Sequence, residues 1–126
     1  MRPLLAFHEL KLNTKDPVYQ QVALFVKRQI LLGRIASGDR LPSRREISAQ
    51  LGINPNTVQK AFKLMEEEGY VRTESTLGSE IYVDAGLRER IEEELTRGLV
   101  QEFIDSAKEI QLPFQKVVQL LSELWE

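Results

Sequence analysis

The feature that most constrains the fold is a pair of helix-start signals close together in the chain. Residues 43–46, Ser-Arg-Arg-Glu, have the capping-box pattern, in which a serine caps a helix and a glutamate three residues later reaches back to it. Residues 54–55, Asn-Pro, give a second start, because asparagine caps well and proline suits the first helical position. Gly52 ends the first helix. The sequence therefore predicts a short helix over 44–51, a tight turn, and a second helix over 55–68.

The second helix of this pair has one apolar and one polar face. Its apolar residues recur at the i, i+3, i+4 and i+7 spacing of a helix that packs on a core, and they are Val58, Ala61, Phe62 and Met65. The opposite face is polar and mostly basic, with Asn56, Gln59, Lys60 and Lys63. We expect the apolar stripe to be buried and the polar face to be available to a partner.

Other elements flank the helix pair. Asp16 as a cap, Pro17 in the first turn and Gly33 as a stop predict a helix over 17–32. After Gly69 the apolar period changes, and two short β segments around Gly78 predict a hairpin over 70–83. Alternation of apolar and polar residues over 7–12 predicts a further short strand.

The last third of the chain returns to a helical period. Apolar residues four apart predict a helix over 86–111, Pro113 breaks it, and a shorter apolar helix follows over 114–125. This αα-hairpin has more large apolar side chains than two helices can bury against each other. We expect a second copy of the chain to cover them, although a hairpin folded back on its own domain remains an alternative. The residues expected at the interface between copies are Leu87, Ile91, Leu95, Leu99, Phe103, Val117, Leu121, Leu124 and Trp125.

The predicted fold is mainly α with a small β-hairpin. Residues 1–83 form a winged helix-turn-helix, and residues 84–126 form a two-helix dimerisation region. In a helix-turn-helix the second helix enters the major groove of DNA with its N-terminal end first. Dimers of such proteins bind two half-sites about one helical turn, ~34 Å, apart. The order of elements therefore predicts that the chain binds double-stranded DNA, and the surplus apolar surface of the C-terminal helices predicts that it does so as a homodimer.

The groove-facing side chains suit this role. Asparagine and glutamine can read a base edge, whereas lysine and arginine suit phosphates. The candidate DNA-binding residues are Ser43, Arg44, Arg45, Asn54, Asn56, Thr57, Gln59, Lys60, Lys63 and Gly78. Some have structural alternatives, because Asn54 can serve only as a cap and Thr57 can hold the turn.

The charge distribution is uneven along the chain. Residues 1–73 hold 12 Lys and Arg against 7 Asp and Glu, whereas residues 74–126 hold 5 against 12. The net charge of −2 therefore divides into +5 and −7. A basic first part favours contact with phosphates, and an acidic second part favours separation from them.

Composition argues against several other classes of protein. There is no Cys and a single histidine, His8, which disfavours a zinc site, a thiol nucleophile or a His-based catalytic site. No apolar run reaches the ~20 residues of a membrane span. We therefore expect no enzyme activity, no cofactor, no membrane partner and a cytoplasmic location. A winged-helix module that binds protein or RNA without operator specificity remains the alternative function.

A run of about 55 residues resembles the GntR family of bacterial transcription regulators, and its Leu-Pro-Ser-x-Arg-Glu stretch is specific to that family. The matching segments are Pro17-x-Tyr19-x-Gln21, Ile30-x-x-Gly33, residues 38–47 (GDRLPSRREI), residues 51–61 (LGINPNTVQKA) and residues 68–71 (EGYV). The short C-terminal part and the Asn-Pro-Asn-Thr-Val sequence are similar to the YtrA subfamily, whose members carry two C-terminal helices in place of a large effector-binding domain.

The resemblance implies a function and residue roles. It implies a regulator, expected to repress its own operon, with ABC transporter genes as typical targets of the subfamily and dimerisation through the C-terminal helices. Whether a small-molecule effector exists stays open. Arg45 matches an arginine that contacts DNA, and Gly78 matches a wing-tip glycine. Glu80 departs from the family pattern, which has a second glycine there, and its carboxylate would be repelled by a phosphate. Either the wing therefore lies farther from the DNA, or Glu80 turns toward protein.

Overall fold

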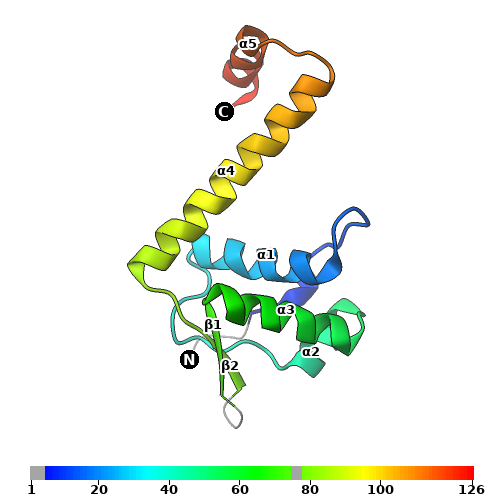
Figure 1. The fold of residues 1–126 in the computed structure, drawn as a ribbon, viewed down its shortest axis with the longest axis vertical. Coiled ribbons are helices and arrows are strands. Elements are labelled where there is room, and N and C mark those ends of the chain that lie inside the picture. The colour runs from blue at the N-terminus through cyan, green and yellow to red at the C-terminus, as the bar shows by residue number, and fades with distance from the viewer. Residues whose placement is uncertain (1–4, 75–77) are drawn as a thin grey trace. The chain divides into compact units, whose positions relative to one another are not determined.

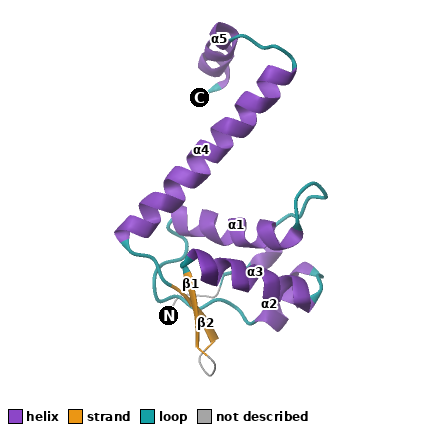
Figure 2. Ribbon diagram, in the orientation of Figure 1, coloured by secondary structure: helices purple, strands orange, loops and turns teal. Residues whose placement is uncertain are grey.

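The computed structural model describes residues 5–74 and 78–126. Helices dominate this part of the chain, and one antiparallel hairpin provides its strands, which confirms the predicted fold class (Figures 1 and 2). The elements in chain order are the 3₁₀ helix η1 (Phe7–Glu9), α1 (Val18–Leu31), α2 (Arg44–Leu51), α3 (Pro55–Glu68), β1 (Val71–Glu74), β2 (Gly78–Ile81), α4 (Ala85–Glu109) and α5 (Phe114–Leu124). The helices predicted over 44–51 and 55–68 have these bounds.

The chain forms two compact units, Met1–Ile91 and Glu92–Glu126. The first unit contains everything from η1 to the first turns of α4, and the second contains the rest of α4 and all of α5.

The core of the first unit lies between α1, α2 and α3, where α3 packs against both other helices (Figure 1). The apolar stripe predicted for α3 is buried, and Val58, Ala61, Phe62 and Met65 are each at most 1% exposed. From α1, Val22, Phe25, Val26 and Ile30 join this core, and Ile47 joins it from α2. Burying each such side chain contributes roughly 1.5–3 kcal/mol, so the first unit has an apolar core of its own.

Polar contacts also fix α1 against the end of α3. The buried Lys27 ammonium of α1 forms an ion pair with Glu68, the last residue of α3. Tyr70 follows directly, and its buried hydroxyl donates to the Ala23 carbonyl of α1 at 3.2 Å. The C-terminal end of α3 is therefore held by both charge and hydrogen bonding.

The predicted strand over 7–12 is wrong, because Phe7–Glu9 form the 3₁₀ helix η1. The reason is a tertiary contact. The Phe7 side chain is fully buried with its ring 5.3 Å from that of Phe25, and its backbone N–H donates to Gln50 of α2. Alternation over a few residues carried no information about this docking.

The start of α1 also differs from the prediction. Pro17 occupies the cap position and no side chain caps the helix, so the predicted cap at Asp16 is wrong. Instead, the Asn13 side chain accepts from the backbone N–H groups of Lys15 and Asp16. The buried Gln21 amide bonds to the Asn13 and Asp16 backbones, which orders the approach to the helix.

The hairpin follows α3 directly. Strands β1 and β2 pair antiparallel, with Val71 opposite Ile81 and Arg72 opposite Glu80. Its inner side chains Val71 and Ile81 are buried in the first unit. The segment before α2 adds to the sheet edge, because Leu41 N–H donates to the Ser79 carbonyl at 2.9 Å.

The second unit is built differently. Its two helices are α4 from Glu92 onward and α5. Among the described residues, the backbones of these two helices do not come close to each other. The helix α4 ends at Glu109, two residues before the predicted end, and Gln111 adopts the left-handed conformation with φ 55°. No helix in residues 5–74 and 78–126 has the length and apolar character needed to cross a membrane.

Candidate nucleic-acid interface

The turn between α2 and α3 is held by local hydrogen bonds on both sides. The Ser43 hydroxyl accepts from the Glu46 N–H at 3.1 Å, and the Glu46 carboxylate accepts from the Ser43 N–H at 3.0 Å, so the predicted capping box is present. At the other end of α2, Gly52 adopts φ +64°, which glycine tolerates without strain. The Ser48 hydroxyl then donates to the Ile53 carbonyl at 2.6 Å. These contacts fix where α2 begins and ends, and so where the turn to α3 starts.

The capping box also affects an ionisable group. Hydrogen bonds from the Ser43 backbone and side chain lower the pKa of the Glu46 carboxyl below its ordinary value. Because the charged form is the one that accepts these bonds, Glu46 remains a carboxylate at neutral pH and holds the first turn of α2.

The first turn of α3 presents polar side chains to solvent. Asn54 is the cap, and its Oδ1 accepts from the Asn56 N–H at 2.7 Å. The side chains of Asn56 and Gln59 are exposed, whereas Thr57 is half-buried. Asn56 and Gln59 are therefore available to a base edge, while Asn54 is engaged in capping.

The basic residues of α3 differ in their surroundings. Lys60 is exposed, but its ammonium lies 4.4 Å from the ring centroid of Tyr19 at the start of α1. Lys63 is also exposed, one turn further along the helix. The contact with Tyr19 narrows the positions that the Lys60 ammonium can take, since a cation is attracted to an aromatic face.

Arg44 and Arg45 are adjacent in α2, but their environments differ. The Arg44 guanidinium lies 4.4 Å above the ring of Phe62, a core residue of α3, and one of its nitrogens is 4.0 Å from the Glu66 carboxylate. Arg45 is exposed to solvent. Arg44 therefore packs α2 against α3, whereas the Arg45 side chain is exposed to solvent.

The hairpin carries the remaining candidate. Gly78, the first residue of β2, is exposed and has φ +80°, a conformation that favours glycine. The Ser79 side chain is buried and lies 2.6 Å from the Thr73 hydroxyl, which ties the strands together beside Gly78. Residues 75–77, which connect the strands, lie outside the described residues.

Glu80 lies within β2 and not at the hairpin connection. It is exposed and sits opposite Arg72 in the antiparallel register. The Arg72 guanidinium in turn stacks on Tyr82, 3.4 Å from the ring centroid. Because Glu80 is exposed, the structure does not support the alternative in which its side chain turns toward protein and is buried there.

Several residues of this region escaped the sequence analysis. Tyr19, Arg72 and Tyr82 were not selected, because each makes a contact with a residue distant in the chain or across the hairpin. Only the register of β1 and β2, once known, would have placed Arg72 beside Glu80.

Comparison with known proteins identifies the family. Residues 18–81, about half of the chain, match the bacterial regulatory proteins of the gntR family, and this match runs from α1 to the end of β2. The chain belongs to the GntR family. Proteins of this family are transcriptional regulators with a DNA-binding helix-turn-helix, and they are not enzymes.

Individual relatives agree with this assignment. The uncharacterized HTH-type transcriptional regulator YhcF of Bacillus subtilis is 30% identical over 85% of this chain and 88% of its own length. The HTH-type transcriptional repressor YtrA of the same organism is 41% identical over 48% of this chain and 47% of its own, which supports the YtrA-like subfamily. A GntR family regulator from Listeria monocytogenes has a similar structure, with a TM-score of 0.79 at 25% identity, covering 90% of this chain and 99% of that one.

The residues predicted for dimerisation of this GntR-family chain fall into two groups. Ile91 is only 2% exposed, so the first unit already covers it, and Leu87 and Leu95 are half-buried. The remaining six, like Leu95, lie in the second unit. Val117 is half-buried, and the other five are exposed by 46–79%: Leu99, Phe103, Leu121, Leu124 and Trp125.

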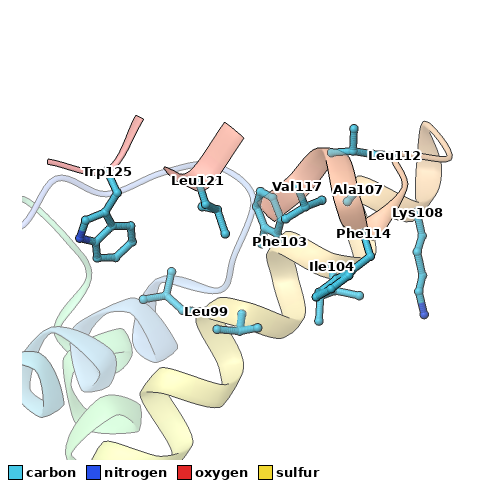
Figure 3. A pocket seen from close by; sticks show the side chains of 11 residues that line it. Leu99, Phe103, Ile104, Ala107, Lys108, Leu112, Phe114, Val117, Leu121 and Trp125 are labelled. Carbon is cyan, nitrogen blue, oxygen red and sulfur yellow. The ribbon is translucent and has the colours of Figure 1, made fainter. Parts of the chain in front are cut away.

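All of these six except Leu124 line an apolar groove in the second unit. Its volume is about 780 Å³, and Lys108 is the sole charged residue among the side chains that line it. Figure 3 shows side chains from α4, among them Leu99 and Phe103, and from the α5 region, among them Leu121 and Trp125, that surround this space. In the described residues, nine of the ten large apolar side chains with high exposure belong to the second unit.

Proposed function

We propose that this chain is a sequence-specific DNA-binding regulator that acts as a homodimer and represses its own operon. The observation that carries the proposal is the exposed polar face at the start of α3. There, a capped helix-turn-helix of a GntR-family chain presents Asn56 and Gln59 to solvent, with Arg45 exposed on the neighbouring helix.

The proposed division of labour follows from chemistry and exposure. Asn56 and Gln59 contact base edges, because an amide offers a donor and an acceptor together and pairs well with adenine. Arg45 and Lys63 contact phosphates, which supply most of the affinity and little of the specificity. Lys60 contacts a phosphate from its position beside Tyr19. Three residues have a structural role in positioning the interface: Asn54, Ser43 and Arg44. The backbone at Gly78 approaches the minor groove.

Homodimerisation is proposed from the second unit. A groove of about 780 Å³ lined by leucine, valine and aromatic side chains is costly to leave in water, at roughly 25 cal/mol per Å² of apolar surface. A second copy of the same face would cover it, as two-fold interfaces are self-complementary. Such a dimer provides two recognition helices for a palindromic operator.

The regulatory direction and the location are proposed from the family. The relative YtrA is a transcriptional repressor, and this chain is 41% identical to it over 61 residues. We infer repression of its own operon, including ABC transporter genes, and a cytoplasmic location, where a regulator meets the chromosome.

Fluorescence anisotropy tests the proposal directly. The protein is titrated onto duplex DNA from upstream of its own gene and onto a scrambled duplex of equal length, at several salt concentrations. We expect binding to the native duplex to be tighter by ~10³-fold or more and to weaken steeply with salt. Equal binding to both duplexes would contradict operator specificity at this site. No binding to either at low salt would favour a protein-interaction module.

A further inference from the structure

Two arginines at the start of α4 bind the carboxyl ends of two other helices. Arg88 donates through Nη2 to the carbonyl of Leu31, the last residue of α1, at 3.1 Å. Arg90 donates through Nη2 to the carbonyl of Glu68, the last residue of α3, at 3.0 Å. The last carbonyls of a helix lack partners within it and carry partial negative charge, so a guanidinium is well suited to bind them.

An apolar contact and a cap hold the same segment. Ile91, one residue after Arg90, is 2% exposed and buried within the first unit. Asp84 caps α4 by accepting from the Leu87 N–H at 2.8 Å. We call residues Asp84–Ile91 the latch. Its anchors combine two charge-assisted hydrogen bonds with one buried side chain.

The latch meets α3 at a residue that is already constrained. The Glu68 carboxylate pairs with the buried Lys27 of α1, while the Glu68 carbonyl accepts from Arg90 of α4. Glu68 therefore joins three helices. Because α3 is a single helix from Pro55 to Glu68, the last turn that the latch contacts and the first turn that carries Asn56 and Gln59 belong to one element.

The same helix reaches the second unit. The helix α4 runs without a break from Ala85 to Glu109, so the latch and the apolar side chains Leu99 and Phe103 belong to one element. A partner bound at those side chains would contact the same helix whose first turns are bound to α3.

We propose that Arg88 and Arg90 are positioning residues that couple the dimer helix α4 to the recognition helix α3. The inference rests on the proposed homodimer. With the latch closed, binding of one half-site by one copy favours binding of the second half-site by its partner, because α4 links the winged unit to the proposed dimer contacts and the second binding step becomes intramolecular. With the latch broken, each winged unit still binds a half-site, but this advantage is lost.

The experiment compares two duplexes, one with both half-sites of the operator and one with a single half-site. The tested variant is Arg88→Ala/Arg90→Ala. The control variant is Arg97→Ala/Lys116→Ala, which removes the same charge from exposed positions of the second unit, one of them in a surface ion pair with Glu93. Affinities come from fluorescence anisotropy, and sedimentation checks the oligomeric state.

We expect the latch variant to remain a dimer, to bind the single half-site within about twofold of wild type, and to bind the full operator about tenfold more weakly. The control should match wild type on both duplexes. An equal loss on both duplexes would overturn the inference, because it would indicate a general effect of charge or stability. Unchanged binding to the full operator would overturn it as well.

Two further readouts keep the test decisive. Wild-type protein that sediments as a monomer, or that binds both duplexes equally, would refute the proposed homodimeric function, whatever the variant does. If the double variant fails to fold, Arg90→Gln is measured alone. A threefold or greater loss confined to the full operator supports the latch, and equal behaviour on both duplexes contradicts it.

Discussion

The two units of this chain differ in how far their apolar side chains are exposed to solvent. In the first unit, most of the large apolar side chains of α1, α2 and α3 are buried, and the exposed polar residues include the candidate DNA-binding residues Arg45, Asn56 and Gln59. In the second unit, leucine, valine, phenylalanine and tryptophan side chains line an open groove. The difference teaches that the first unit has a covered apolar core as a single copy, whereas the second unit leaves an apolar face open, which we propose a second copy covers.

A matched pair of phenylalanines tests this contrast with the largest expected effect. Phe62 is 1% exposed in the first unit, whereas Phe103 is 46% exposed in the second. Phe62→Ala should lower the free energy of unfolding by about 3–5 kcal/mol, because it leaves a cavity in the core. Phe103→Ala should leave the unfolding of the winged unit unchanged. Urea denaturation followed by circular dichroism measures both. Similar losses of unfolding free energy in the two variants would contradict the difference between the units.

The second prediction concerns the groove. Leu95→Glu/Leu99→Glu places carboxylates on the apolar face of α4, so the variant should sediment as a monomer. Its operator affinity should fall by about 100-fold, because each half-site is then bound separately. Leu32→Glu is the control, since Leu32 is also an exposed leucine, 61% accessible, but lies in the first unit. If the double variant still sediments as a dimer, the proposed interface is wrong.

The third prediction separates the adjacent arginines of α2. Arg45→Ala should weaken operator binding by about tenfold and reduce its salt dependence, with no change in stability. Arg44→Ala should instead cost roughly 1 kcal/mol of folding free energy, since it removes the stacking on Phe62. Anisotropy titrations and thermal unfolding of both variants give the comparison. The opposite result would contradict this distinction: Arg44→Ala leaves the stability unchanged and weakens operator binding more than Arg45→Ala does.

The smallest effect concerns pH and the capping box. Hydrogen bonds to Ser43 lower the pKa of Glu46 in the folded chain, so Glu46 contributes stability above its unfolded pKa. That contribution is lost as the pH falls through the lowered folded pKa. Glu46→Gln should therefore flatten the acid side of the stability profile of the first unit, measured as thermal midpoints across pH. A profile identical to wild type would show that the carboxylate has no such role.

Local signals in the sequence predicted the helix-turn-helix well. The bounds of α2 and α3 follow from Ser43, Asn54 and the glycines after each helix, and these signals act within a few residues. The secondary structure of a short apolar run is not set by such local signals. Residues 7–9 therefore became a 3₁₀ helix once Phe7 docked on Phe25.

The candidate interface was only partly accessible to sequence reasoning. Residue type and helical spacing selected Asn56, Gln59 and Arg45, which the structure leaves exposed. Nothing local distinguished Arg44 from Arg45, because the ring that Arg44 covers belongs to another helix. The four-residue spacing in α4 likewise gave one apolar stripe and did not reveal that Ile91 is covered by the first unit.

Sedimentation equilibrium of the intact chain over a wide concentration range tests the central contrast most directly. The account predicts a species of twice the mass of one chain at micromolar concentration, in the absence of DNA, since the groove of the second unit is covered by a second copy. A single-chain mass at every concentration would contradict it and leave the apolar face of the second unit without its proposed partner.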